Sequence, residues 1–223
     1  IDDFYGGSFA LSHTLRNVSA AMLFDGYFKK YLYSSGYSSK IILKTEPSHD
    51  VAFLDPIILP LLALENMEFI SAVSYLSRYE KIALVSNSNS ARTILDCCAA
   101  PLSKRLELGF VNCNECKKCQ RTIIAFDTMG KLDLFSKVFD LDFYGKNKRK
   151  FHGELFARSY AGNQRDTEII EEGRKKSYVF IPSYISFFKY YFHGILIENL
   201  KRKFFRNASS LKIKFTSRKK NIY

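Results

Sequence analysis

Cysteines recur at every third position of one short segment of this chain. Cys113, Cys116 and Cys119 lie within NCNECKKCQRT, and two further cysteines end the upstream segment LDCC. A C-x2-C-x2-C run can turn back on itself and offer three thiolates to one metal ion, while a distant segment supplies the fourth ligand. That fourth ligand is either Cys97 or Cys98, and we favour Cys98. The predicted metal ligands are therefore Cys98, Cys113, Cys116 and Cys119.

Zinc is the metal that this pattern favours, because it takes four sulfur ligands in a tetrahedron. An iron–sulfur cluster is the second candidate, but the ferredoxin run has a further cysteine and then proline, and Ile123 stands at that cysteine position. An odd number of cysteines argues against a disulfide framework. Unconnected core cysteines are the remaining alternative. Four closed thiolate ligands leave no position for a substrate, so we expect a structural zinc site and assign no catalytic residue.

Basic residues accompany the cysteines. Lys117, Lys118 and Arg121 lie inside or beside the run, and Lys104 and Arg105 precede it. Four thiolates around one Zn²⁺ carry a net negative charge, which nearby cations stabilise. A solvated helix face is the alternative explanation for the two lysines.

The positive charge of the chain is concentrated at its end. The 223 residues carry a net charge of +12, and residues 199–223 hold nine Lys or Arg and no acidic residue. The first 198 residues therefore carry only +3. Such a tail suits nucleic acid, anionic lipid or an acidic partner, or it simply solubilises the chain.

The other general features predict a cytoplasmic protein. Clustered cysteines and no recognisable leader indicate a reducing compartment. The most apolar stretch, 178–197, contains Pro182, Lys189, His193 and Gly194, so we expect a core or interfacial helix there and no transmembrane span. The chain begins at Ile1, which suggests truncation.

Helix and strand patterns alternate in the first half of the chain, as in an α/β layer. We expect helices over 8–30, 57–64, 77–87 and 117–129, strands over 31–35, 67–73 and 93–97, and a helical pair over 151–172. The basic segment KNKRK (146–150) is expected at a boundary. The predicted divisions are 1–94 as a partial α/β region, 95–145 as the cysteine module with its following helices, and 146–223 as a helical extension with the basic tail.

The helix expected from Ser77 opens with a capping-box pattern, in which Glu80 is the partner of Ser77. Arg78 and Lys81 lie three residues apart on this helix and so face the same side. Near a helix N-terminus such a pair can hold phosphate, or it can form a solvated face with Glu80 as its partner.

Three segments together resemble one family. SRYEKIALV (77–85), LDCC (95–98) and NCNECKKCQRTIIAFDTMGKLDLF (112–135) are similar to the C-terminal half of PP-loop proteins, the adenine nucleotide alpha-hydrolase-like enzymes of the 7-cyano-7-deazaguanine synthase type. The similarity spans roughly 30–140 and is specific only in its cysteines. It implies a partial Rossmann-like (HUP-type) layer, with zinc on the four cysteines. It also implies that Arg78, Lys81 and Arg121 border a nucleotide or substrate pocket.

The resemblance also implies a reaction. Enzymes of the family adenylate a carboxylate with ATP and Mg²⁺, and an amine such as ammonia then attacks, so a small carboxylate would be the substrate. The phosphate-binding SGGxDS loop of the family is absent, because Gly6-Gly7-Ser8 lacks the Asp-Ser ending. The chain alone is therefore expected to be inactive, as a fragment of an ATP-dependent ligase-like enzyme. The alternative is a non-catalytic zinc-stapled binding module whose tail, 199–223, contacts nucleic acid or an acidic partner.

Overall fold

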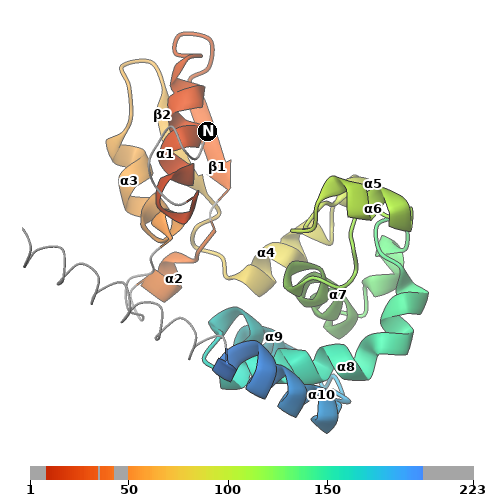
Figure 1. Cartoon of the computed structure of the whole chain (residues 1–223). Helices are drawn as coiled ribbons and strands as arrows, with labels where there is room; N and C mark the ends of the chain where they lie inside the picture. Colours follow the sequence, from red (N-terminus) through yellow and green to blue (C-terminus); the bar gives the residue numbers. More distant parts are fainter. Residues whose placement is uncertain (1–8, 35, 43–49, 198–223) are drawn as a thin grey trace, which may run out of the picture. The chain divides into compact units, whose positions relative to one another are not determined.

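The computed structural model describes residues 9–34, 36–42 and 50–197. The chain divides into two compact units, Ile1–Leu84 and Val85–Tyr223, which are described separately (Figure 1). The first is mixed α/β and the second is helical. The division falls ten residues before the boundary expected at 94/95, at the end of a helix.

The first unit contains a small parallel sheet. Its elements are α1 (Phe9–Met22), β1 (Lys30–Ser34), α2 (Ser39–Ile42), the 3-10 helix η1 (Val51–Leu54), α3 (Asp55–Leu61), β2 (Glu68–Ala72) and α4 (Arg78–Val85). The strands pair in parallel from Lys30↔Glu68 to Ser34↔Ala72. Parallel neighbours need a crossover connection, and α2, η1 and α3 lie within it.

The core of this unit lies between the sheet and its helices. It consists of Val18 and Ala21 from α1, Leu59 from α3, and Met67 and Phe69 at β2. Alternate residues of a strand point to opposite faces, so Tyr31 and Tyr33 of β1 both pack on this core. The strands predicted over 31–35 and 67–73 are thus confirmed, whereas the first helix ends at Met22 and not at residue 30. A turn replaces its last part, and Gly26 adopts a positive φ of 86° there.

The strand predicted over 93–97 is wrong. Residues Ala91–Ile94 form the one-turn helix α5, in which the amides of Thr93 and Ile94 both donate to the carbonyl of Ser90. The Thr93 hydroxyl donates to the same carbonyl. Local hydrogen bonds therefore close a helical turn at these residues, and the chain continues without regular structure to the LDCC cysteines.

The second unit is built from helices. After α5 come α6 (Leu102–Leu108), α7 (Lys117–Thr128), the 3-10 helix η2 (Leu132–Phe135), α8 (Leu141–Tyr160), α9 (Gln164–Lys175), α10 (Tyr184–Lys189) and the π-helical η3 (Tyr190–Leu196). Its core is aromatic and aliphatic, and the Phe126 and Phe135 rings stack with centroids 3.8 Å apart. The helix predicted over 117–129 is confirmed, and Gly130 follows it with a φ of 66°.

Two other expectations for this unit fare differently. The helical pair over 151–172 is present as α8 and α9. The basic segment 146–150 does not mark a boundary, because it lies inside α8. A continuous helix requires only that its inward positions be apolar, and Tyr144 and Phe151 on either side of the segment are both buried.

The described part of the chain is mostly helical, with a two-stranded parallel sheet. A wider Rossmann-like layer remains a prediction. Among the described residues, no helix is long and apolar enough to cross a membrane.

Candidate metal centre

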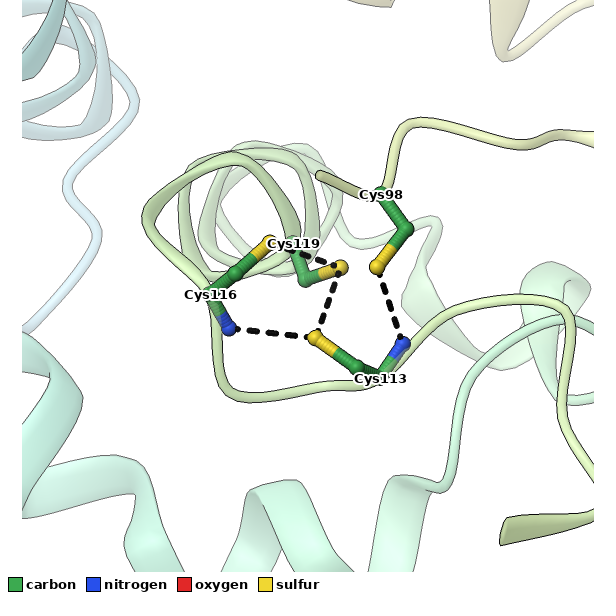
Figure 2. Close-up of side chains that lie close together, drawn as sticks. All are labelled: Cys98, Cys113, Cys116 and Cys119. Carbon is green, nitrogen blue, oxygen red and sulfur yellow. Dashed lines mark hydrogen bonds between the residues drawn. The ribbon is translucent and has the colours of Figure 1, made fainter. Parts of the chain in front are cut away.

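The four predicted ligands meet at one point. The sulfur atoms of Cys98, Cys113, Cys116 and Cys119 all lie within 4.8 Å of one another (Figure 2). The Sγ of Cys119 is 3.5 Å from that of Cys116 and 3.9 Å from that of Cys113. Sulfurs at Zn–S distances of about 2.3 Å in a tetrahedron lie about 3.8 Å apart, so these residues fit a single tetrahedral ion.

A tight turn brings the first two cysteines of the run together. Asn114 adopts a positive φ of 62°, which asparagine tolerates better than most residues. Its buried side chain donates to the carbonyl of Asn112 and accepts from the amide of Asp140, which holds the turn in place. The amide of Cys116 then donates to the sulfur of Cys113 over 3.3 Å. Cys116 caps α7, so Cys119 points from the first turn of that helix.

The distant arm presents Cys98 in a similar way. Its sulfur accepts from the amide of Ala100 over 3.3 Å and from the amide of Cys113 over 3.4 Å. Together with the Cys116 amide, three backbone N–H groups point at sulfurs of the cluster, as Figure 2 shows for two of them. Hydrogen-bond partners of this kind orient metal ligands, so the backbone holds the sulfurs of Cys98 and Cys113 in place.

Asn112 holds the distant arm against the turn. This fully buried side chain donates to the carbonyls of Leu95 and Val138, and it accepts from both the amide and the thiol of Cys97. The thiol of Cys97 is therefore engaged by Asn112, while Cys98 joins the four-sulfur group. Sequence reasoning assigned no role to Asn112. Its position directly before Cys113 is the only signal that the sequence offers.

Arg105 supplies positive charge next to the cluster. It donates to Asp96 over 2.6 Å and to the carbonyl of Val111 over 3.0 Å, so it ties the two arms together. Its hydrogen bond lowers the pKa of the Asp96 carboxyl. The guanidinium also interacts electrostatically with Cys98 and Cys113. The charge of Lys118 also acts on Asp96, whereas Lys117 stacks over the ring of Tyr190.

The thiols strongly influence one another's ionisation. The hydrogen bond with Cys119 lowers the pKa of Cys116 to about 4. Cys116, then Cys97 and burial raise the pKa of Cys119 far above its usual range. Burial likewise raises the pKa of Cys113. Without a cation the close sulfurs cannot all be charged, so binding a dication would release protons.

Arg121 lies in a different constellation. Its guanidinium forms two hydrogen bonds with Asp166, of 3.0 Å and 2.5 Å, and Arg158 donates to the same buried carboxylate over 3.1 Å. Arg158 also donates to Gln120. These contacts join α7, α8 and α9. The paired guanidinium of Arg121 thus has a structural role in this unit, and the pocket role implied by the resemblance remains a prediction.

Arg78 and Lys81 open α4 in the first unit, and both are half-buried. The predicted capping box is present, because the Glu80 amide donates to the Ser77 hydroxyl over 3.2 Å and the Ser77 amide donates to Glu80 over 2.7 Å. Glu80 also pairs with Lys40. The structure thus brings the four cysteines together. Arg78 and Lys81 belong to the first unit and Arg121 to the second, and the nucleotide pocket that the resemblance implies for them remains a prediction.

A second polar cluster escaped the sequence analysis. The Asp127 carboxylate accepts from Tyr144 over 2.6 Å, from Lys148 over 2.8 Å and from Tyr178. Burial opposes its ionisation, but these hydrogen bonds outweigh that effect and hold the pKa of Asp127 below its usual value. His152 lies beside both tyrosines. Residues spread over 127–178 carry no local motif, so no sequence signal pointed to them.

No family model, curated protein or solved structure matches the chain. The family resemblance therefore rests on the sequence segments alone, and the site must be interpreted from its own geometry.

Proposed function

We propose that the described residues form a non-catalytic, zinc-stapled binding module. The observation that carries this proposal is the convergence of four cysteine sulfurs within 4.8 Å. Zinc bound by four thiolates has no open position and contributes directly to folding. It would join the arm that ends at Cys98 to the start of α7, and so replace the regular structure that residues 95–116 largely lack.

The backbone and Arg105 support zinc in this role. Three amides donate to cluster sulfurs, and such partners of metal ligands orient them and tune their affinity. Arg105 offsets part of the negative charge of a four-thiolate zinc site. Four thiolates in a tetrahedral arrangement also suit an iron–sulfur centre. Elemental analysis of the purified protein therefore decides which metal is bound.

The test compares adjacent cysteines. Cys98→Ser should abolish stoichiometric zinc in the purified protein, measured by elemental analysis, whereas Cys97→Ser should retain it. The Co²⁺-substituted parent protein should show the absorption bands of a tetrahedral thiolate site, and this measurement does not depend on the folding of any variant. Full zinc in Cys98→Ser would refute the ligand assignment, and acid-labile sulfide would establish an iron–sulfur centre instead.

A second candidate function is ATP-dependent adenylation of a small carboxylate, followed by attack of an amine. The parallel β1–β2 pair with its helical crossover favours it, since ligands of open α/β sheets bind beyond the carboxyl ends of the strands. Helix α4 follows β2 at that end, so Arg78 and Lys81 are suitably placed in sequence to contact phosphate oxygens. Bound ATP and Mg²⁺ would supply the activated phosphoryl group, and these cations would stabilise its charge.

This candidate is tested by nucleotide binding to the full-length gene product. Calorimetric titration with ATP and Mg²⁺ should show binding that Arg78→Ala with Lys81→Ala weakens at least about tenfold, the loss of roughly one charge-assisted hydrogen bond. Stoichiometric zinc without any nucleotide binding would exclude the enzyme and leave the binding module.

A further inference from the structure

The last described helices of the second unit, α10 and η3, carry an exposed stripe of large apolar side chains. Tyr184, Phe188 and Phe192 recur every four residues along α10 and η3, and Ile185 lies beside them. All four are exposed, Ile185 by 82% and Phe188 by 53%. At about 1.5 Å per residue, the stripe is roughly 12 Å long from Tyr184 to Phe192. Contiguous exposed apolar surface of this kind marks an interaction site.

The opposite side of the same helices is fixed to the protein. The rings of Phe187 and Tyr191 contact that of Tyr160 on α8, with centroids 6.1 Å and 5.4 Å apart. Arg158 and Lys117 stack on Tyr190. This inner face packs α10 and η3 against α8 and leaves the outer stripe exposed.

Basic residues lie beside the start of the stripe and follow its end in the sequence. At its start, the amide of Ser183 donates to the carbonyl of Arg149 over 2.8 Å, so the basic segment of α8 lies at the N-terminus of α10. Lys146, Arg149 and Lys150 of that segment are exposed. At its end, the chain continues within a few residues into 199–223, with its nine basic residues and no acidic one. Lys189 is exposed on the stripe itself.

We propose that α10 and η3 lie flat on an anionic lipid surface and insert the Tyr184–Phe192 stripe at the level of the headgroups. This inference rests on the proposed function and names the partner of the module. Interfacial helices combine aromatic and aliphatic residues on one face with nearby cations, and two weak signals together give stable binding. Each Lys or Arg near an anionic surface contributes about 1 kcal/mol, and the exposed apolar side chains add the insertion.

Lipid fits the surface better than nucleic acid does. Tyrosine and phenylalanine can stack on bases, but Ile185, the most exposed residue of the stripe, has no such role, whereas it partitions well into acyl chains. A phosphate backbone would account for the basic residues alone. The apolar stripe and the cations together therefore point to lipid.

Fluorescence offers a direct test, because the chain contains no tryptophan. Phe188→Trp places a single reporter on the stripe, and Phe28→Trp places one at a similarly exposed site, 59% exposed, in the first unit. Vesicles of phosphatidylglycerol mixed with phosphatidylcholine should shift the emission of Phe188→Trp to the blue, and brominated acyl chains should quench it. Phe28→Trp should do neither, and vesicles of phosphatidylcholine alone should have little effect.

Cosedimentation supplies the energetic test. Ile185→Ser should weaken partitioning onto the mixed vesicles about tenfold, which corresponds to the loss of most of one isoleucine burial. Ile57→Ser, an exposed isoleucine of α3, should leave partitioning unchanged. Both sites are exposed, so thermal unfolding of the two variants should match that of the parent protein.

Several results would overturn the proposal. One is vesicle binding that leaves the emission of Phe188→Trp unchanged, since the tail alone would then be responsible. Another is a blue shift that depends on protein concentration without vesicles, which would identify a second copy as the partner. A third is oligonucleotide binding that prevents vesicle binding and is weakened equally by Ile185→Ser. Zinc content measured on the same samples separates these failures from failure of the metal site.

Discussion

The ionisation of His152 depends on how the helices of the second unit pack around it. Its ring is fully buried between α8 and the segment that precedes α10, where Nδ1 accepts from the amide of Ile181 over 3.1 Å. Its Nε2 lies 3.4 Å from the hydroxyl of Tyr178. Burial, together with the charge of Lys148, lowers the pKa of His152 to about 4. The neutral ring is therefore part of the folded structure.

The stability of the protein should depend on pH through this residue. An ordinary histidine titrates near 6.5, so the unfolded chain binds more protons between about pH 4 and 6.5 than the native protein does. The free energy of unfolding is therefore unaffected by His152 above pH 6.5. It falls as the pH is lowered towards 4, by about 3 kcal/mol in total. NMR titration of the His152 ring should show it neutral at pH 5.5 in the native protein and largely charged in urea. A native midpoint near 6.5 would contradict the packing described.

At the scale of elements, α8 organises the second unit through two glycines with opposite surroundings. A Cβ on Gly153 would lie 2.5 Å from the carbonyl oxygen of Ser183 and 3.1 Å from the amide of Phe187, so α10 begins directly on this glycine. A Cβ on Gly145 would meet nothing within 4 Å. The first glycine allows close approach of two helices, while the second only adds flexibility to α8.

The two alanine variants should therefore change stability in opposite directions. Gly145→Ala should raise the free energy of unfolding by about 0.5–1 kcal/mol, because alanine loses less backbone entropy in a helix. Gly153→Ala should lower it by about 1–3 kcal/mol, because α10 must shift away from α8. Urea unfolding of both variants measures the difference. Equal effects would show that α10 does not pack on Gly153.

The elements themselves were predictable where local signals agreed. Helix α7 has apolar positions at helical spacing and Gly130 as its stop, and α4 has its capping box, so both were placed correctly. The predicted strand at 93–97 failed because the amides of Thr93 and Ile94 donate to the carbonyl of Ser90 and so close a helical turn. The four sulfurs were predicted by their spacing, whereas Asn112 and the Asp127 cluster depend on long-range contacts that no local pattern encodes.

The division into two units has a consequence for the metal. All four cysteines belong to the second unit, which also has its own apolar core around Phe126, Phe135 and Phe139. The rings of Phe126 and Phe139 meet edge to face, with centroids 6.4 Å apart. Cys113 and Cys119 are buried together with this core, whereas α8 and α9 also bury apolar side chains of their own, such as Phe151, Leu155 and Ile169. The metal is therefore not the sole support of those two helices.

Chelation of the metal should therefore unfold one region and not the whole chain. We expect backbone amides of residues 95–119 and the first turn of α7 to exchange hydrogen much faster after zinc is removed, because their structure depends on the staple. Amides of α8 and α9 should stay protected by the aromatic core, and those of β1 and β2 serve as an internal reference. Hydrogen exchange with mass spectrometry resolves these segments. Unchanged exchange throughout would mean that no metal supports the fold, while complete loss of protection in the second unit would mean that the core cannot hold α8 and α9 without it.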